Sequence, residues 1–191
     1  MGRRERRLIS LLGGSGATVT YRSERELETR IRSLILTHIT ARNSTVYPLT
    51  NKKAVDILIC KDGPKPELFF IEVKHHQTKH GRLGFGGSKG SGFQPEILSR
   101  KPAYFEKNLR WVLACEEHES DEVLFLTSEI IRQYLAGGVV AEKFNNLQEK
   151  IFREQTWLNE YQFVDQLQLW LGVTAAQQGA QPGRGKQRRA G

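Results

Sequence analysis

The chain has 191 residues, of which 38% are hydrophobic and 26% are charged, and its formal net charge is +8. This length supports one ordinary domain with a hydrophobic core. No apolar run approaches the ~20 residues that span a bilayer, and the stretch 8–12 is shorter than the ~7–15 residues of a secretory signal core. We therefore expect a cytoplasmic protein with no membrane partner, in which Cys60 and Cys115 are buried thiols and not a disulfide.

The positive charge is concentrated in three segments. Residues 1–22 and 172–191 each carry a net charge of +4, and residues 74–101 carry +5. Basic segments favour a polyanionic partner, although basic tails also serve solubility alone. We predict a basic flexible segment at 1–22, a single domain at 23–171 and a basic disordered tail at 172–191.

The spacing of apolar residues predicts the first elements. A helix begins after Ser23, which can act as N-cap with Glu26 as its capping-box partner. The helix pattern ends near Asn43. Three strands follow, at 46–48, 54–60 and 68–74.

The second and third of these strands are joined by a turn rich in Gly and Pro, which predicts an antiparallel hairpin. Residues 75–98 then form a long, basic, glycine-rich loop, and loops of this length in compact domains are usually functional or disordered. Beyond the loop, we predict a helix from Pro102 to about Glu117 and a strand at 122–126. Further helices are predicted at 127–136, 140–153 and 157–171.

Three charged residues of the hairpin form a chemically complete set. Glu72 and Lys74 point to the same face of their strand, and Asp56 lies on the neighbouring strand. A carboxylate beside a lysine in an apolar strand costs desolvation energy, which a metal or a phosphate offsets. Carboxylates and waters suit Mg²⁺, and the metal activates a water. The lysine can orient or deprotonate that water, or neutralise the developing charge. The pattern predicts phosphodiester hydrolysis, whereas ordinary salt bridges on a surface strand are the alternative.

Asp56 followed by Glu72-x-Lys74 resembles the motif of the PD-(D/E)XK nuclease superfamily, which includes type II restriction endonucleases and Holliday-junction resolvases. The resemblance covers residues 22–126 in the order of the αβββαβ core, with Val55 in place of the family's proline. It implies an α/β fold with a restriction-endonuclease-like core: a mixed central β-sheet flanked by helices, with extra C-terminal helices. It also implies that Asp56 and Glu72 bind Mg²⁺, with Mn²⁺ as a substitute, and that Lys74 is the catalytic lysine.

The superfamily often adds a glutamate from the first helix. Glu24 and Glu28 are four residues apart and share a helix face with Ile31 and Ile35. The residues alone do not separate these two, and an ordinary solvated helix face explains either one equally well.

The loop after the motif supplies the side chains that contact DNA. Arg, Lys and Gln read base edges, and the glycines permit close approach of the backbone to phosphates. His75 and His76 are predicted to contact DNA or a metal-bound water, although a histidine pair at a strand end is also ordinary polar surface. The loop contains no Walker or dinucleotide motif, so no nucleotide cofactor is expected. The predicted DNA-binding residues are His75, His76, Gln77, Lys79, His80, Arg82, Lys89, Ser91, Gln94, Arg100 and Lys101.

These observations predict a sequence-specific type II restriction endonuclease that cleaves double-stranded DNA. Because one chain carries one active site, cutting both strands of a palindromic site needs a homodimer. Two alternatives remain open: a Holliday-junction resolvase or another structure-selective DNA-processing nuclease, and a catalytically inactive DNA-binding module of the same fold.

Overall fold

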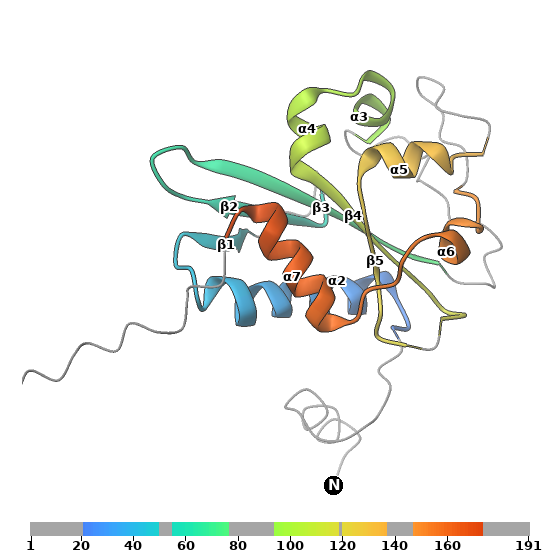
Figure 1. Ribbon diagram of the computed structural model, residues 1–191, viewed down its shortest axis with the longest axis horizontal. Coiled ribbons are helices and arrows are strands. Elements are labelled where there is room, and N and C mark those ends of the chain that lie inside the picture. Colours follow the sequence, from blue (N-terminus) through green and yellow to red (C-terminus); the bar gives the residue numbers. More distant parts are fainter. Residues whose placement is uncertain (1–20, 50–54, 77–93, 119, 137–146, 174–191) are drawn as a thin grey trace, which may run out of the picture.

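The computed structural model describes residues 21–49, 55–76, 94–118, 120–136 and 147–173. These residues form one mixed sheet with the strand order β1-β2-β3-β4-β5, and helices pack on both of its faces (Figure 1). The predicted α/β class, with a mixed sheet flanked by helices, is confirmed. Most of the predicted N-terminal segment and C-terminal tail lies outside the described residues.

The first helix, α2 (Glu24–Leu34), begins where the sequence predicts. The Ser23 hydroxyl accepts a hydrogen bond from the Glu26 backbone N–H at 3.2 Å, and the Glu26 carboxylate accepts one from the Arg22 backbone N–H at 3.1 Å. The first bond satisfies an N–H group that a helix start leaves without a partner, and the second reaches the residue before the N-cap. A π-helix, η1 (Ile35–Thr40), continues α2 without a break. The residues buried along both helices are Leu27, Ile31, Leu34, Ile35 and Ile39.

The sheet confirms the predicted hairpin. The pairing of β2 with β3 is antiparallel, and it runs from Ile57 opposite Ile71 to Lys61 opposite Glu67. The pairs β1–β2 and β4–β5 are also antiparallel, whereas β3–β4 is parallel. The strands are β1 (Val46–Leu49), β2 (Ile57–Lys61), β3 (Glu67–His76), β4 (Leu109–Cys115) and β5 (Leu124–Leu126).

The predicted helix from Pro102 to Glu117 is wrong. Pro102 precedes a short helix, α4 (Ala103–Asn108), and β4 then begins at Leu109. The sequence of β4 is an almost continuous apolar run, because the strand lies between β3 and β5 and is buried on both faces. Such a run has no period of two, so its pattern alone does not distinguish a central strand from a buried helix.

Two hydrophobic cores lie on opposite faces of the sheet. On one face α2, η1 and α7 (Glu160–Leu171) pack against odd-numbered residues of β3 such as Ile71. On the other face the short helices surround β4, whose Trp111 is fully buried. These helices are α3 (Gln94–Arg100), α5 (Ser128–Gln133) and α6 (Ile151–Glu154). The helices predicted at 127–136 and 157–171 correspond to α5 and α7. Of the helix predicted at 140–153, residues 151–153 belong to α6, whereas 147–150 are not helical.

The helices and the two cysteines bear on the predicted absence of a membrane span and of a disulfide. None of the helices in the described part of the chain is long and apolar enough to cross a lipid bilayer. Cys60 and Cys115 are free thiols, of which Cys115 is buried and Cys60 is partly exposed.

Candidate active site

The candidate site lies where β3 continues beyond the start of β2. The pairing with β2 covers Glu67–Ile71, whereas the pairing with β4 continues to His76. Extending the β2–β3 register by one residue places Asp56 opposite Glu72, on the same face of the sheet. The Asp56 carboxylate also accepts a hydrogen bond from the Val73 backbone N–H at 2.7 Å. Asp56 therefore occupies the edge of β3 that β2 leaves open.

The Lys74 side chain lies among three carboxylates, and these four residues are called the Lys74 cluster below. The Nζ atom of Lys74 is 2.7 Å from Glu72 Oε1, 3.8 Å from Asp56 Oδ2 and 3.7 Å from Glu24 Oε1. It also donates to the Val73 backbone carbonyl at 2.9 Å. The sequence predicted that Asp56, Glu72 and Lys74 meet, and the structure brings all three together.

Burial changes the protonation of this cluster. The Glu72 side chain is 5% exposed and that of Lys74 is 13% exposed. Burial raises the pKa of Glu72 to about 7, and the neighbouring Lys74 offsets only part of this effect. Burial by itself lowers the pKa of Lys74, but Glu72, Asp56 and Glu24 together raise it above its ordinary value. Lys74 is therefore a cation at neutral pH, and Glu72 titrates near neutrality.

The first helix supplies one of the two glutamates that the sequence left open. Glu24 lies in the first turn of α2, its side chain is 48% exposed, and its carboxylate is the one that pairs with Lys74. Glu28 is partly buried one turn further along the same helix. The start of α2 reaches Lys74 because this part of β3 has no β2 strand beside it.

The carboxylates fit a hard divalent cation by their chemistry, because Mg²⁺ prefers carboxylate and water oxygens. They already surround one cation, the Lys74 ammonium group. In this arrangement, no group of three acidic, imidazole or thiol side chains among the described residues is close enough to hold a metal ion. Asp56 and Glu72 are the residues that would hold Mg²⁺, with Glu24 beside them.

The two histidines that follow Lys74 point into the fold, which differs from the predicted contact with DNA. His75 is 8% exposed, and its Nε2–H donates to the Tyr21 backbone carbonyl at 2.8 Å. Burial lowers the pKa of His75, so the ring is neutral. His76 is 3% exposed and stacks on Phe152, with its Nε2 atom 3.7 Å from Glu149 Oε1. Strand β3 is longer than predicted and includes both histidines.

The other predicted DNA-binding residues lie in or next to α3, or outside the described residues. Gln94 begins α3, and Arg100 and Lys101 are exposed at the end of that helix. Lys101 has a positive φ of 53°. The remaining residues, Gln77, Lys79, His80, Arg82, Lys89 and Ser91, lie outside the described residues.

Sequence reasoning missed two backbone contacts that hold the site. The Val73 N–H orients Asp56, and the Tyr21 carbonyl holds His75. Every residue has such backbone groups, so no sequence signal identifies them.

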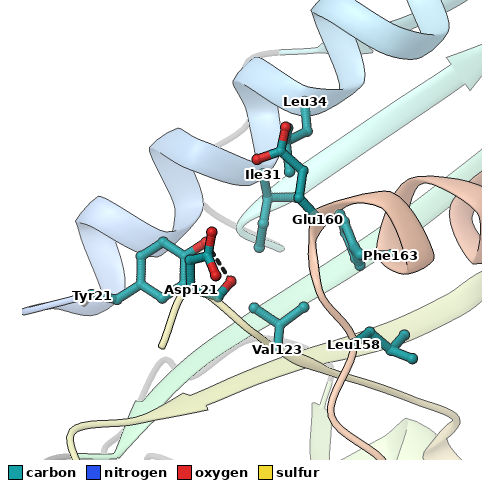
Figure 2. Close-up of a pocket in the computed structure, with 8 residues that line it drawn as sticks. All are labelled: Tyr21, Ile31, Leu34, Asp121, Val123, Leu158, Glu160 and Phe163. Atoms are coloured by element: carbon teal, nitrogen blue, oxygen red, sulfur yellow. Dashed lines mark hydrogen bonds between the residues drawn. The ribbon is translucent and has the colours of Figure 1, made fainter. Parts of the chain in front are cut away.

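A small pocket lies between α2 and the start of α7, and the four residues of the Lys74 cluster do not line it (Figure 2). The Tyr21 hydroxyl donates to the Asp121 backbone carbonyl at 3.2 Å, and burial raises the pKa of Tyr21 to about 12. The lining contains no basic side chain that would attract a phosphate. Its residues are Tyr21, Ile31, Leu34, Asp121, Val123, Leu158, Glu160 and Phe163.

The Lys74 cluster brings three carboxylates within 4 Å of one ammonium group. Comparisons of the chain with protein-family models, with curated proteins and with solved structures gave no match.

Proposed function

We propose that this protein is a metal-dependent endonuclease that hydrolyses phosphodiester bonds in double-stranded DNA. The observation that carries the proposal is the Lys74 ammonium group within 4 Å of the carboxylates of Glu24, Asp56 and Glu72. Glu24 lies in α2, Glu72 and Lys74 lie in β3, and Asp56 lies just before β2. The three carboxylates surround the partly buried Lys74 ammonium group. Such a site serves a reaction in which negative charge builds up on a phosphate.

The order of elements supports the restriction-endonuclease-like core. From α2 through β1, β2 and β3 to the helices α3 and α4 and then β4, the chain follows the αβββαβ order of that superfamily. The last strand of this order is β4 and not the predicted strand at 122–126, and it lies parallel to β3. The three motif residues lie on β3 and just before β2, as the motif requires.

Each residue of the Lys74 cluster has a separate role in the proposed reaction. Asp56 and Glu72 would hold the divalent metal, Mg²⁺ or Mn²⁺, and Glu24 would add negative charge beside them. When bound, the metal supplies positive charge at the scissile phosphate and a water of lowered pKa. Lys74 orients that water or neutralises the charge that develops on the phosphate.

We propose further that the protein is a sequence-specific type II restriction endonuclease that acts as a homodimer. One chain carries one Lys74 cluster, so cleavage of both strands at a palindromic site needs two chains. The net charge of +5 over residues 74–101, a segment that begins at Lys74 itself, favours binding of DNA.

Digestion of genomic DNA with Mg²⁺ tests the proposal. We expect discrete bands from the unmodified chain, no cleavage with EDTA, and no cleavage by Lys74→Ala, which retains binding to DNA in Ca²⁺. Lys107→Ala is the matched control, because Lys107 is 71% exposed and pairs with Glu67. Binding without cleavage by the unmodified chain would indicate an inactive DNA-binding module and contradict the proposed activity.

Cleavage of a four-way DNA junction distinguishes a Holliday-junction resolvase, the second candidate function, from a restriction endonuclease. The contact of Glu24 with Lys74 favours this comparison, because Glu24-Arg25 early in the first helix also resembles Holliday-junction resolvases. Preferential cleavage of the junction over linear duplex with the same arm sequences would assign the chain to structure-selective nucleases.

A further inference from the structure

The Lys74 ammonium group occupies the centre of the carboxylate cluster. It donates hydrogen bonds to Glu72 Oε1 at 2.7 Å and to the Val73 carbonyl at 2.9 Å. An ammonium group has three donors. Asp56 and Glu24, at 3.8 Å and 3.7 Å, are too distant for ordinary hydrogen bonds but close enough to attract the charge.

Several acidic groups lie around the Lys74 ammonium group. Three carboxylates face one ammonium group, and the Glu72 and Lys74 side chains are both largely removed from water. Carboxylate oxygens gathered in such a place attract cations. A hard divalent cation of this kind needs oxygen ligands at ~2.1 Å, which is closer than any N···O distance in the cluster.

We propose that Lys74 serves as a built-in counter-ion that competes with the divalent metal for the same carboxylates, so that metal binding releases the Lys74 side chain. This inference rests on the proposed function and adds a step to it. Two cations cannot share one position because they repel each other, and Lys74 is joined to the backbone by a flexible four-carbon chain that can move aside. The released ammonium group remains on β3, beside the position where the phosphate binds.

The proposal gives Lys74 opposite effects on two measurements. A neutral side chain at this position removes the competing charge, which tightens metal binding, and it also removes the charge that assists cleavage. A lysine that acted only on the phosphate would change cleavage and leave metal affinity unchanged.

Calorimetric titration of the full chain with Ca²⁺ tests the competition without cleavage. We expect Lys74→Met to bind Ca²⁺ more tightly by about tenfold or more, since removal of a cation within ~4 Å is worth over ~1.4 kcal/mol in a partly buried site. Lys107→Met should match the unmodified chain, because Lys107 lies on α4 and pairs with Glu67.

The outcomes separate the two proposals. Equal or weaker Ca²⁺ affinity in Lys74→Met, with clear binding by the unmodified chain, would overturn the competition and leave the nuclease proposal standing. If neither the unmodified chain nor Lys74→Met bound Ca²⁺ at millimolar concentration, both the competition and the proposed nuclease function would be overturned.

A second measurement needs no variant. Acetylation of the unmodified chain by an amine-reactive ester, followed by mass spectrometry, reports how accessible each lysine is. Addition of Ca²⁺ should increase the labelling of Lys74 relative to Lys107, because the ammonium group leaves Glu72. An unchanged ratio at saturating Ca²⁺ would contradict the release of Lys74.

Discussion

The Asp56 carboxylate accepts the backbone N–H of Val73 at 2.7 Å, across the edge of β3 where β2 has not yet begun. This bond orients one carboxylate oxygen of Asp56 toward the strand. The same Oδ2 atom is 3.8 Å from Lys74 Nζ, so the bond also holds the Asp56 carboxylate near the Lys74 ammonium group.

The two roles of Asp56 can be separated by substitution. Asp56→Asn retains an oxygen that can accept from Val73 but removes the charge, whereas Asp56→Ala removes both. We expect both variants to lose cleavage, and Asp56→Ala to lose about 1 kcal/mol more unfolding free energy than Asp56→Asn. Urea unfolding measures the difference. Equal stability of the two variants would show that the bond to Val73 adds nothing to folding.

Glu24 and Glu28 provide a matched pair on one helix. Glu24→Gln should lower the rate of cleavage about tenfold, which corresponds to ~1.4 kcal/mol of transition-state stabilisation, because it removes a charge 3.7 Å from Lys74. Glu28→Gln should leave the rate nearly unchanged. The measurement is initial cleavage rate at fixed Mg²⁺, with circular dichroism as a check on folding. A larger decrease in Glu28→Gln would reverse the assignment.

The pKa of Glu72 predicts a pH dependence of stability. Its pKa is raised from 4.5 to about 7 by burial, so the folded state retains a proton that the unfolded chain releases. The stabilisation from this proton is complete below pH 4.5 and is lost as the pH rises through about 7, by about 3 kcal/mol at most. Unfolding in EDTA should show that Glu72→Gln loses less stability than the unmodified chain between about pH 5 and pH 8. Parallel pH profiles would refute this effect.

The buried pair of Trp111 and Ser128 predicts a core effect unrelated to the site. Trp111 Nε1 donates to Ser128 Oγ at 3.0 Å, and both residues are almost fully buried. Trp111→Phe should lower the free energy of unfolding by about 1–3 kcal/mol, because Ser128 loses its donor inside the fold. The double variant with Ser128→Ala should lose less than the two single variants combined. Strict additivity would show that the hydrogen bond does not couple the two residues.

Basic residues after the motif predict a salt effect on DNA binding. Replacement of Lys79, Arg82 and Lys89 by alanine removes three positive charges from the segment predicted to contact DNA. We expect weaker binding in Ca²⁺ and a shallower dependence of log K on log salt, by about one unit for each phosphate interaction removed. Gel-shift titrations at several salt concentrations measure this slope. An unchanged slope would exclude interactions between these residues and DNA phosphates.

The sequence by itself determined the hairpin and three members of the cluster. Alternation along β3 places Glu72 and Lys74 on one face, and the short turn before Glu67 pairs β3 with β2, so Asp56 had to lie near them. These are relationships between residues that are close in the chain, where strand period and turn chemistry act directly.

The tertiary structure alone decided the rest. Residues 109–115 form the central strand β4 and not a helix, because burial on both faces removes the period from their sequence. The contact of Glu24 with Lys74 and the inward ring of His75 depend on how the start of α2 lies against β3. The inward ring of His76 depends on its packing against Phe152 of α6. Contacts between distant segments depend on packing and burial, and these leave no local signal in the chain.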